Sequence, residues 1–229
     1  MTGAWQARCC GEDIAVPSTS FVYKLCAAEA MAREDRHEHG GQGRTRRRAH
    51  PRAAGRQGDG DARQLAVWDR IAQSRGRVAG PFAALLHSPE LARRIAETGH
   101  YVRFEGPLTQ AERELAIITV ARLLDAQYEW VAHAVLARKA GVRDEVIAAV
   151  RERRAPAGLT PAEAQVHGYA VALLREHRVS DETFAALQAR FGLEGLVDLT
   201  ATVGSYAMIA CAPNAFGIEP TPGEPLLPA

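Results

Sequence analysis

One segment near the middle of the chain is apolar on every helical face, and it constrains the fold strongly. The run Leu115–Ala121 reads Leu-Ala-Ile-Ile-Thr-Val-Ala, with one hydroxyl among aliphatic side chains. A helix that is apolar all round has to be covered by other elements on several sides. Upstream, Thr109 and Glu112 have the spacing of a capping box, which marks a helix start. We therefore expect a buried central helix from Thr109 to about Leu124.

The rest of this region predicts more helices and no convincing alternating strand. Ser88 and Pro89 indicate a capped start, and Thr160–Glu163 repeats the capping box. Gly141 and Gly192 are typical helix stops, and Pro213 is expected to end the last helix. Expected helices begin near Leu65, Ser88, Thr109, Gln127, Arg143, Thr160, Ser180 and Gly195. Short connections favour antiparallel neighbours, so the predicted class is an all-α helical bundle.

Composition divides the chain into three parts. Residues 27–63 contain no Leu, Ile, Val, Phe, Tyr or Trp and are rich in arginine and glycine. Such a segment buries too little apolar surface to offset the entropy lost on ordering. We expect residues 1–63 to be a disordered Arg/Gly-rich segment and residues 64–217 to form the helical domain. Residues 218–229 are expected to form a proline-rich extended tail.

Charge and cysteine usage exclude several classes of function. The formal net charge is +1, which gives no global argument for a nucleic-acid partner, and the arginine cluster is more typical of a solvated tail. No apolar run has the length of a membrane span, and the start lacks the order of a secretory signal. The four cysteines offer neither a Cys-x-x-Cys pair nor the spacing of a zinc site. We expect a cytoplasmic protein without a metal, membrane or nucleic-acid partner.

Polar chemistry is concentrated at Glu114, Glu129 and His133. Glu129 and His133 are four residues apart, so they share a helix face. Burying carboxylates and a histidine near a core costs free energy unless the groups are paired, so such groups indicate either pairing or a functional role. One interpretation is an acid–base pair in a pocket, with the carboxylate fixing the imidazole tautomer. The other is an exposed i,i+4 ion pair. Glu114 could anchor His133, carry a second proton, or complement its helix dipole.

Neighbouring side chains extend this candidate site. Tyr128 and Trp130 are candidates to line the pocket and bind substrate, although buried aromatics are more often core residues. Arg122 lies in the buried helix and needs a partner there. That partner is either Asp125 nearby or a substrate carboxylate.

The residues Glu114, Tyr128, Glu129, Trp130 and His133 resemble the carboxymuconolactone decarboxylase / alkylhydroperoxidase D superfamily. The resemblance runs from about Val67 to Phe216 and includes the later Gly204-Ser205-Tyr206 and Asn214-Ala215-Phe216. It implies an all-helical fold whose protomers associate, commonly as trimers or hexamers. It also implies that Tyr206 and Asn214 approach the substrate pocket.

Two branches of the superfamily differ at this site. The hydroperoxidase branch has Glu, then Cys-x-x-Cys, then His four residues after the second Cys; here Ala126 and Glu129 take the cysteine positions. A dithiol peroxidase needs a thiolate and a resolving thiol, which neither residue supplies. The decarboxylase branch instead has Glu four residues before His, as at Glu129 and His133.

The resemblance thus implies a cofactor-independent acid–base lyase acting on a small carboxylated lactone or keto acid, as in aromatic degradation. The alternatives are an alkylhydroperoxidase-like antioxidant enzyme and a non-catalytic oligomeric binding protein. Fold class alone does not separate the three.

Overall fold

The computed structural model describes residues 6–9, 12–15, 62–76, 78–221 and 224–228. The chain divides into two compact units, Met1–Arg48 and Ala49–Ala229. In the first unit, strand β1 (Gln6–Cys9) pairs antiparallel with β2 (Glu12–Ala15), with Gln6 opposite Ala15. The expectation of disorder is wrong for these eight residues, because strands of four residues are too short to show alternation in the sequence. The rest of the expected disordered segment 1–63 lies almost entirely outside the described residues.

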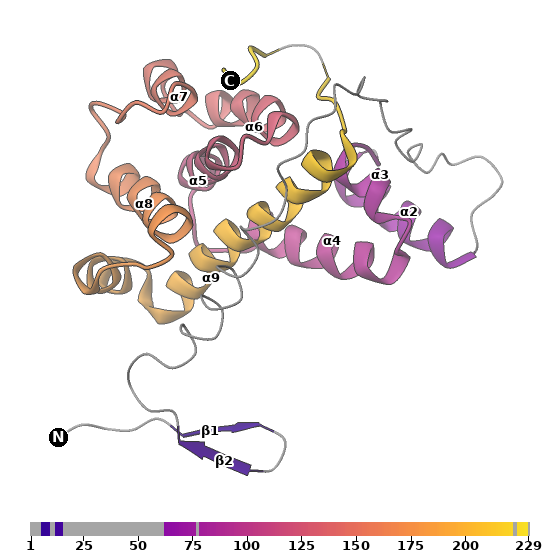
Figure 1. The fold of residues 1–229 in the computed structure, drawn as a ribbon, viewed down its shortest axis with the longest axis horizontal. Coiled ribbons are helices and arrows are strands. Elements are labelled where there is room, and N and C mark those ends of the chain that lie inside the picture. The colour runs from indigo at the N-terminus through magenta and orange to yellow at the C-terminus, as the bar shows by residue number, and fades with distance from the viewer. Residues whose placement is uncertain (1–5, 10–11, 16–61, 77, 222–223, 229) are drawn as a thin grey trace, which may run out of the picture. The chain divides into compact units, whose positions relative to one another are not determined.

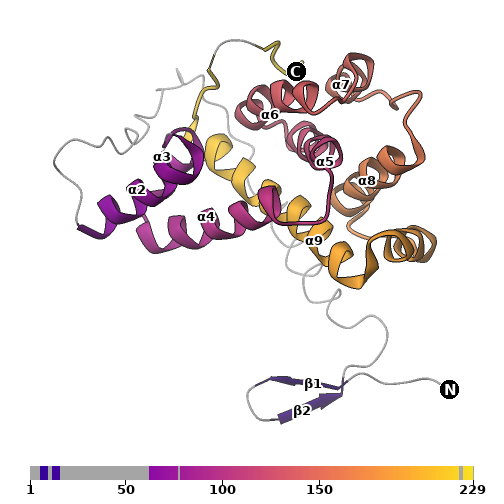
Figure 2. The same cartoon turned by 180° about the vertical axis from the view of Figure 1, so that it is seen from behind.

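The described part of the second unit is all-helical, as predicted. Its helices are α2 (Ala62–Arg75), α3 (Pro81–Leu85), α4 (Pro89–Phe104), α5 (Gln110–Leu123), α6 (Gln127–Lys139), α7 (Asp144–Arg151), α8 (Pro161–Val171), the π-helical turn η2 (Ala172–Glu176) and α9 (Asp181–Phe216). Figures 1 and 2 show α9 running between a group formed by α2, α3 and α4 and a group formed by α5 to α8.

Helix α5 is the buried element that its composition predicted. Leu115, Ile117 and Ile118 are fully buried, and α5 contacts α6, α7, α8 and α9. Its capping box is complete: Thr109 N–H donates to Glu112 Oε2 at 3.1 Å, and Glu112 N–H donates to Thr109 Oγ1 at 3.3 Å. The cap fixes where α5 begins, and therefore which turn of the helix carries Glu114.

Helix α9 differs from the prediction at one of its two boundaries. Gly192 has a φ of 70° and interrupts the helix, which agrees with the predicted stop. The prediction that Pro213 ends the last helix is wrong, because α9 continues to Phe216 and ends at Gly217 with a φ of 61°. A proline removes one N–H donor without stopping the residues that follow it. The Pro213 carbonyl still accepts from Ile218 N–H at 3.0 Å.

By length and composition alone, α9 is also apolar enough to cross a membrane. Its place in the fold accounts for much of this composition, because α9 contacts α3, α4, α5, α6 and α8. Leu196, Leu199 and Val203 of α9 belong to the core that α5 and α8 share. A helix at the centre of a bundle is apolar for that reason.

A short C-terminal strap, residues 224–228, covers the back of α6. Gln127 Nε2 donates to the Leu227 carbonyl at 3.0 Å, and Leu227 N–H donates to Gln127 Oε1 at 2.8 Å. Trp130 Nε1 donates to the Pro225 carbonyl at 3.0 Å, and the Leu227 side chain joins the core of α5, α6 and α7. The strap therefore completes the side of α6 that faces away from the candidate site.

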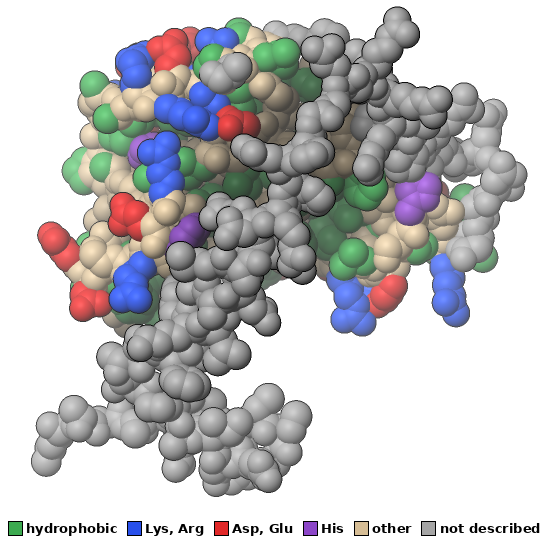
Figure 3. Space-filling model, viewed as in Figure 1, with side chains coloured by type: hydrophobic (Ala, Val, Ile, Leu, Met, Phe, Trp, Pro, Cys, Tyr) green, Lys and Arg blue, Asp and Glu red, His purple; other side chains and the backbone are tan. Residues whose placement is uncertain are grey.

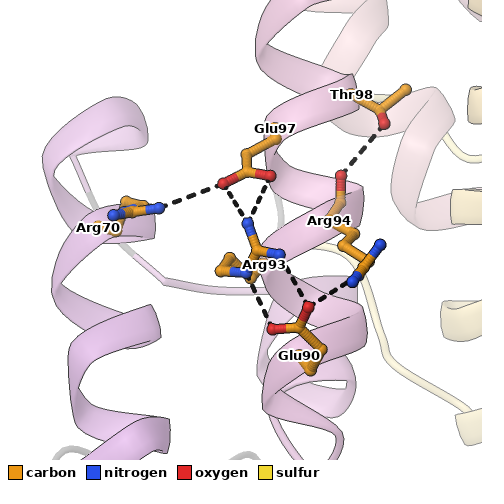
Figure 4. A network of polar contacts seen from close by, with 6 residues as sticks. All are labelled: Arg70, Glu90, Arg93, Arg94, Glu97 and Thr98. Atoms are coloured by element: carbon orange, nitrogen blue, oxygen red, sulfur yellow. Dashed lines mark hydrogen bonds and ion pairs between the residues drawn. The ribbon is translucent and has the colours of Figure 1, made fainter.

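A charged network on the surface links α2 to α4 (Figure 4). Arg93 donates to Glu97 at 2.6 Å and to Glu90 at 2.8 Å, and Arg70 of α2 reaches Glu97 at 3.2 Å. Two guanidiniums, Arg93 and Arg94, hold the pKa of Glu90 down at about 2 by hydrogen bonding. Exposed pairs of this kind stabilise a fold only slightly. Acidic and basic side chains also lie together on the surface over α7 and α8 (Figure 3).

Candidate active site

A cavity of about 170 Å³ lies between α3, α4, α6 and α9. Helices α4, α6 and α9 contribute residues at helical spacing, so one face of each of these helices points into the same space. The lining residues are Ala79, Pro81, Phe82, Ile95, Gly99, Val102, Arg103, Tyr128, Glu129, Ala132, His133, Ser205, Tyr206, Met208 and Ile209. The lining is largely apolar, with a few polar groups, which is the usual character of a small-molecule site.

His133 lies between two buried carboxylates. Its Nδ1 is 2.7 Å from Glu114 Oε2, and its Nε2 is 3.6 Å from Glu129 Oε2. The exposed fractions are 6% for His133, 2% for Glu114 and 4% for Glu129. A carboxylate that accepts a hydrogen bond from Nδ1–H leaves Nε2 to exchange the proton. With Glu114 as the acceptor of the Nδ1–H bond, the exchangeable position is Nε2, which lies toward Glu129.

The three groups lie at different depths. His133 and Glu129 line the cavity, whereas Glu114 lies behind the imidazole and is not among the lining residues. Of the interpretations left open for Glu114, the geometry favours the anchor, because Glu112 is the acidic residue in the first turn of α5. The exposed ion-pair interpretation of Glu129 and His133 does not fit their burial.

Two tyrosines flank the histidine from different helices. The ring of Tyr206 meets the His133 imidazole edge-on, with centroids 5.0 Å apart and an interplanar angle of 84°. Tyr128 lines the cavity and packs against Gly80, which has a φ of 60°. A Cβ atom at Gly80 would overlap the Tyr128 ring, so this position holds glycine for both backbone and steric reasons.

Three residues expected near the site lie elsewhere. Trp130 is a core residue that holds the strap through Pro225. Arg122 pairs with Asp125 and lines a different cavity. Asn214 donates to the Leu124 carbonyl at 2.9 Å, where it fixes the turn between α5 and α6. Helical periodicity explains the first result, because Trp130 does not share the face of α6 formed by Glu129 and His133.

Sequence reasoning missed two polar groups of the cavity, Arg103 and Ser205. The half-buried Arg103 brings a guanidinium to the wall formed by α4, and its side chain also lies over the Phe104 ring at 5.1 Å. Gly99 and Arg103 are one helical turn apart and share a face with Ile95, but this spacing does not tell which face of the helix lines a cavity.

Cys211 is exposed, its Sγ lies 3.3 Å from the Ala207 carbonyl, and it does not line the cavity. Among the described residues, no group of three or more His, Cys, Asp or Glu side chains is placed to hold a metal ion.

Comparison with known proteins shows which family the region around the site resembles. Residues 89–187, which include Glu114, Glu129 and His133, match the model of the carboxymuconolactone decarboxylase family. No curated protein sequence matches the chain.

Two solved structures show the same fold. One is described as an alkylhydroperoxidase AhpD core, an uncharacterised peroxidase-related protein from Ralstonia eutropha, with 22% identity and a TM-score of 0.59 over 69% of this chain and 85% of that one. The other is an uncharacterised peroxidase-related protein from a Silicibacter species, with 17% identity and a TM-score of 0.58 over 69% of this chain and 84% of that one. Residues 89–187 are therefore similar to the carboxymuconolactone decarboxylase family, and the described helices form an all-helical fold similar to that of the alkylhydroperoxidase AhpD core.

Proposed function

We propose that this protein is an acid–base lyase of the decarboxylase type, acting without a cofactor on a small carboxylated lactone or keto acid. The observation that carries the proposal is the arrangement of His133 between Glu114 and Glu129 at the wall of the cavity. A buried imidazole with one nitrogen anchored and the other directed toward the reaction space is suited to moving a proton.

The proposed reaction uses the remaining polar groups of the cavity. The bond between the substrate and its carboxylate breaks, carbon dioxide leaves, and the electron pair moves through an adjacent carbonyl to form an enolate. Hydroxyl groups of Tyr128 and Tyr206 would donate to the developing oxyanion. The His133 imidazolium, stabilised by both carboxylates, then transfers its Nε2 proton to carbon and regains one from solvent. Arg103 would hold the substrate through a second anionic group or an oxygen of the lactone.

The test is turnover of candidate substrates by single variants of the purified protein. His133→Ala should lower kcat by roughly 100-fold or more, the usual contribution of a positioned proton donor. His87→Ala is the matched control, because His87 is an exposed histidine outside the cavity. Circular dichroism should show the same helix content for both variants. Full turnover by a folded His133→Ala variant would contradict the proposal.

A second candidate function is peroxide reduction with a thiol reductant, since both structural neighbours are described as peroxidase-related. The sequence opposes it, with Ala126 and Glu129 at the positions of the family's cysteine pair. Consumption of an organic hydroperoxide, compared between the natural protein and Cys211→Ser, separates the two functions. Activity lost in Cys211→Ser would favour the peroxidase, whereas no consumption by either protein would favour the lyase.

A further inference from the structure

A second cavity, of about 310 Å³, lies apart from the candidate active site and shares no lining residue with it. Its walls come from α5, α7, α8, η2 and the segment after α7. The lining residues are Thr119, Arg122, Leu123, Val150, Arg153, Arg154, Ala155, His167, Val171 and Arg175. Cationic side chains and a histidine therefore converge from four parts of the fold, and no Asp or Glu is among the lining residues.

The deepest of these cations is incompletely satisfied. Arg122 is 5% exposed, and its guanidinium pairs with Asp125. Its Nε is buried and has no hydrogen-bond partner among the described residues. A buried guanidinium N–H without an acceptor is costly, because it has lost water and gained nothing in return. An acceptor that enters the cavity would remove this cost.

The local charges leave a positive excess. Asp125 is shared, because it also accepts from Arg153 Nη2 at 2.7 Å. Arg154 pairs with Glu152 at 2.7 Å, and Arg175 has no ion pair or hydrogen bond with another described residue. Four arginines therefore face two carboxylates, an excess of two positive charges at one cavity. Burial and the nearby Arg175 also lower the pKa of His167.

The backbone around this cavity departs from regular geometry. Arg175 lies on η2, and π-helical turns occur often at functional sites. Asp125 has a φ of 49° and Arg153 a φ of 56°, a left-handed conformation that costs free energy for residues with a Cβ atom.

We propose that this cavity is a binding site for the phosphate group of a small phosphorylated ligand. A phosphate carries close to two negative charges near neutral pH, which matches the local excess, and its oxygens can accept from several guanidiniums at once. Arginine is the residue suited to such recognition, because its planar fork presents paired donors. The volume admits a phosphate group together with part of the molecule that bears it.

The first experiment titrates inorganic phosphate into the full chain at constant ionic strength, with chloride as the balancing anion. Binding is followed by ³¹P NMR line width and by the rise in Tm that a ligand of the native state causes. Arg175→Gln and Arg154→Gln should each weaken phosphate binding by about tenfold, the effect of losing one charge-assisted hydrogen bond. Both side chains are exposed, so both variants should fold.

Arg178→Gln is the matched control, because Arg178 is an exposed arginine three residues after Arg175 and outside the cavity lining. It should bind phosphate like the natural protein. Unchanged binding in the Arg154→Gln/Arg175→Gln double variant would overturn the proposal, as would the absence of binding to the natural protein. A parallel titration with succinate tests the chemistry of the ligand. Tighter binding of succinate than of phosphate would overturn the phosphate assignment. His133→Ala should bind phosphate normally, so this test is independent of the lyase proposal.

Discussion

At the scale of single residues, His133 is held from behind by Glu114 and approached from the cavity by Glu129. The two carboxylates should therefore have separable effects. In Glu114→Gln the amide can donate to Nδ1 and move the imidazole proton to the wrong nitrogen. We expect kcat to fall by about 100-fold with little change in KM. Steady-state kinetics on the identified substrate measures both, and ¹⁵N NMR of the imidazole reports the tautomer. A normal kcat with an altered tautomer would contradict the role given to Glu114.

Gly80 offers a second test at this scale. Gly80→Ala adds a Cβ atom where the Tyr128 ring lies and imposes a positive φ on alanine. We expect a loss of about 1–3 kcal/mol in the free energy of unfolding, together with a higher KM as Tyr128 moves. Gly168→Ala is the control, because Gly168 lies in α8 with open space around its Cα. That variant should be neutral or stabilising by up to about 1 kcal/mol in urea denaturation.

His167 predicts a pH dependence of stability. Burial, and then the positive charge of Arg175, lower its pKa below the ordinary value of 6.5. The unfolded chain therefore binds more protons than the native state, and stability should decline as pH falls from 6.5 through the native pKa. His167→Gln should flatten this part of the curve of Tm against pH, whereas His87→Gln should leave it unchanged. An identical slope in His167→Gln would contradict the prediction.

The sequence predicted the centre of the site better than its walls. Spacing alone indicated that Glu129 and His133 share a face, and the apolar run around Glu114 indicated burial. Arg103 was missed because a surface and a cavity-lining arginine look alike in an amphipathic pattern. Which side of α4 faces the cavity depends on tertiary packing, which local periodicity does not encode.

At the scale of elements, the capping boxes at Thr109 and Thr160 predicted the starts of α5 and α8, and both are complete. Helix α3 was missed because its five residues are too few to show a period. The π-helical turn η2 was missed as well, because it continues α8 without a sequence signal of its own. Helix boundaries that are set by side-chain caps depend on neighbouring residues, so they can be predicted from the sequence. Helix boundaries that are set by tertiary packing cannot.

The strap offers a prediction at the scale of an element. Leu227 is 4% exposed and packs in the core beside α6, whereas its neighbour Leu226 is 53% exposed. Leu227→Ala should lower the free energy of unfolding by about 2 kcal/mol, at the low end for a buried leucine. Leu226→Ala should change it by less than about 0.5 kcal/mol. Urea denaturation of both variants measures these changes. Equal effects on the free energy of unfolding would show that the apolar contact of Leu227 does not stabilise the domain.

At the scale of the whole molecule, α9 joins two helical groups and leaves an apolar surface. Leu193, Val197, Met208 and Phe216 of α9 are exposed large side chains. We propose that this surface is covered in a homo-oligomer, as expected from the family resemblance. Light scattering of the full chain should give a mass above that of one chain, and Val197→Glu should lower it. A monomer at micromolar concentration would contradict this prediction.

The position of the strap along the chain has a consequence for biosynthesis. Residues 224–228 leave the ribosome after every helix of the domain, yet Gln127 and Trp130 hydrogen-bond to them. Helix α6 therefore emerges about a hundred residues before the partners that cover its back. Until those partners arrive, the nascent domain exposes apolar surface on the side of α6 that faces away from its candidate site. Burial of that side of α6 during translation should accordingly be a late event, set by the arrival of the strap.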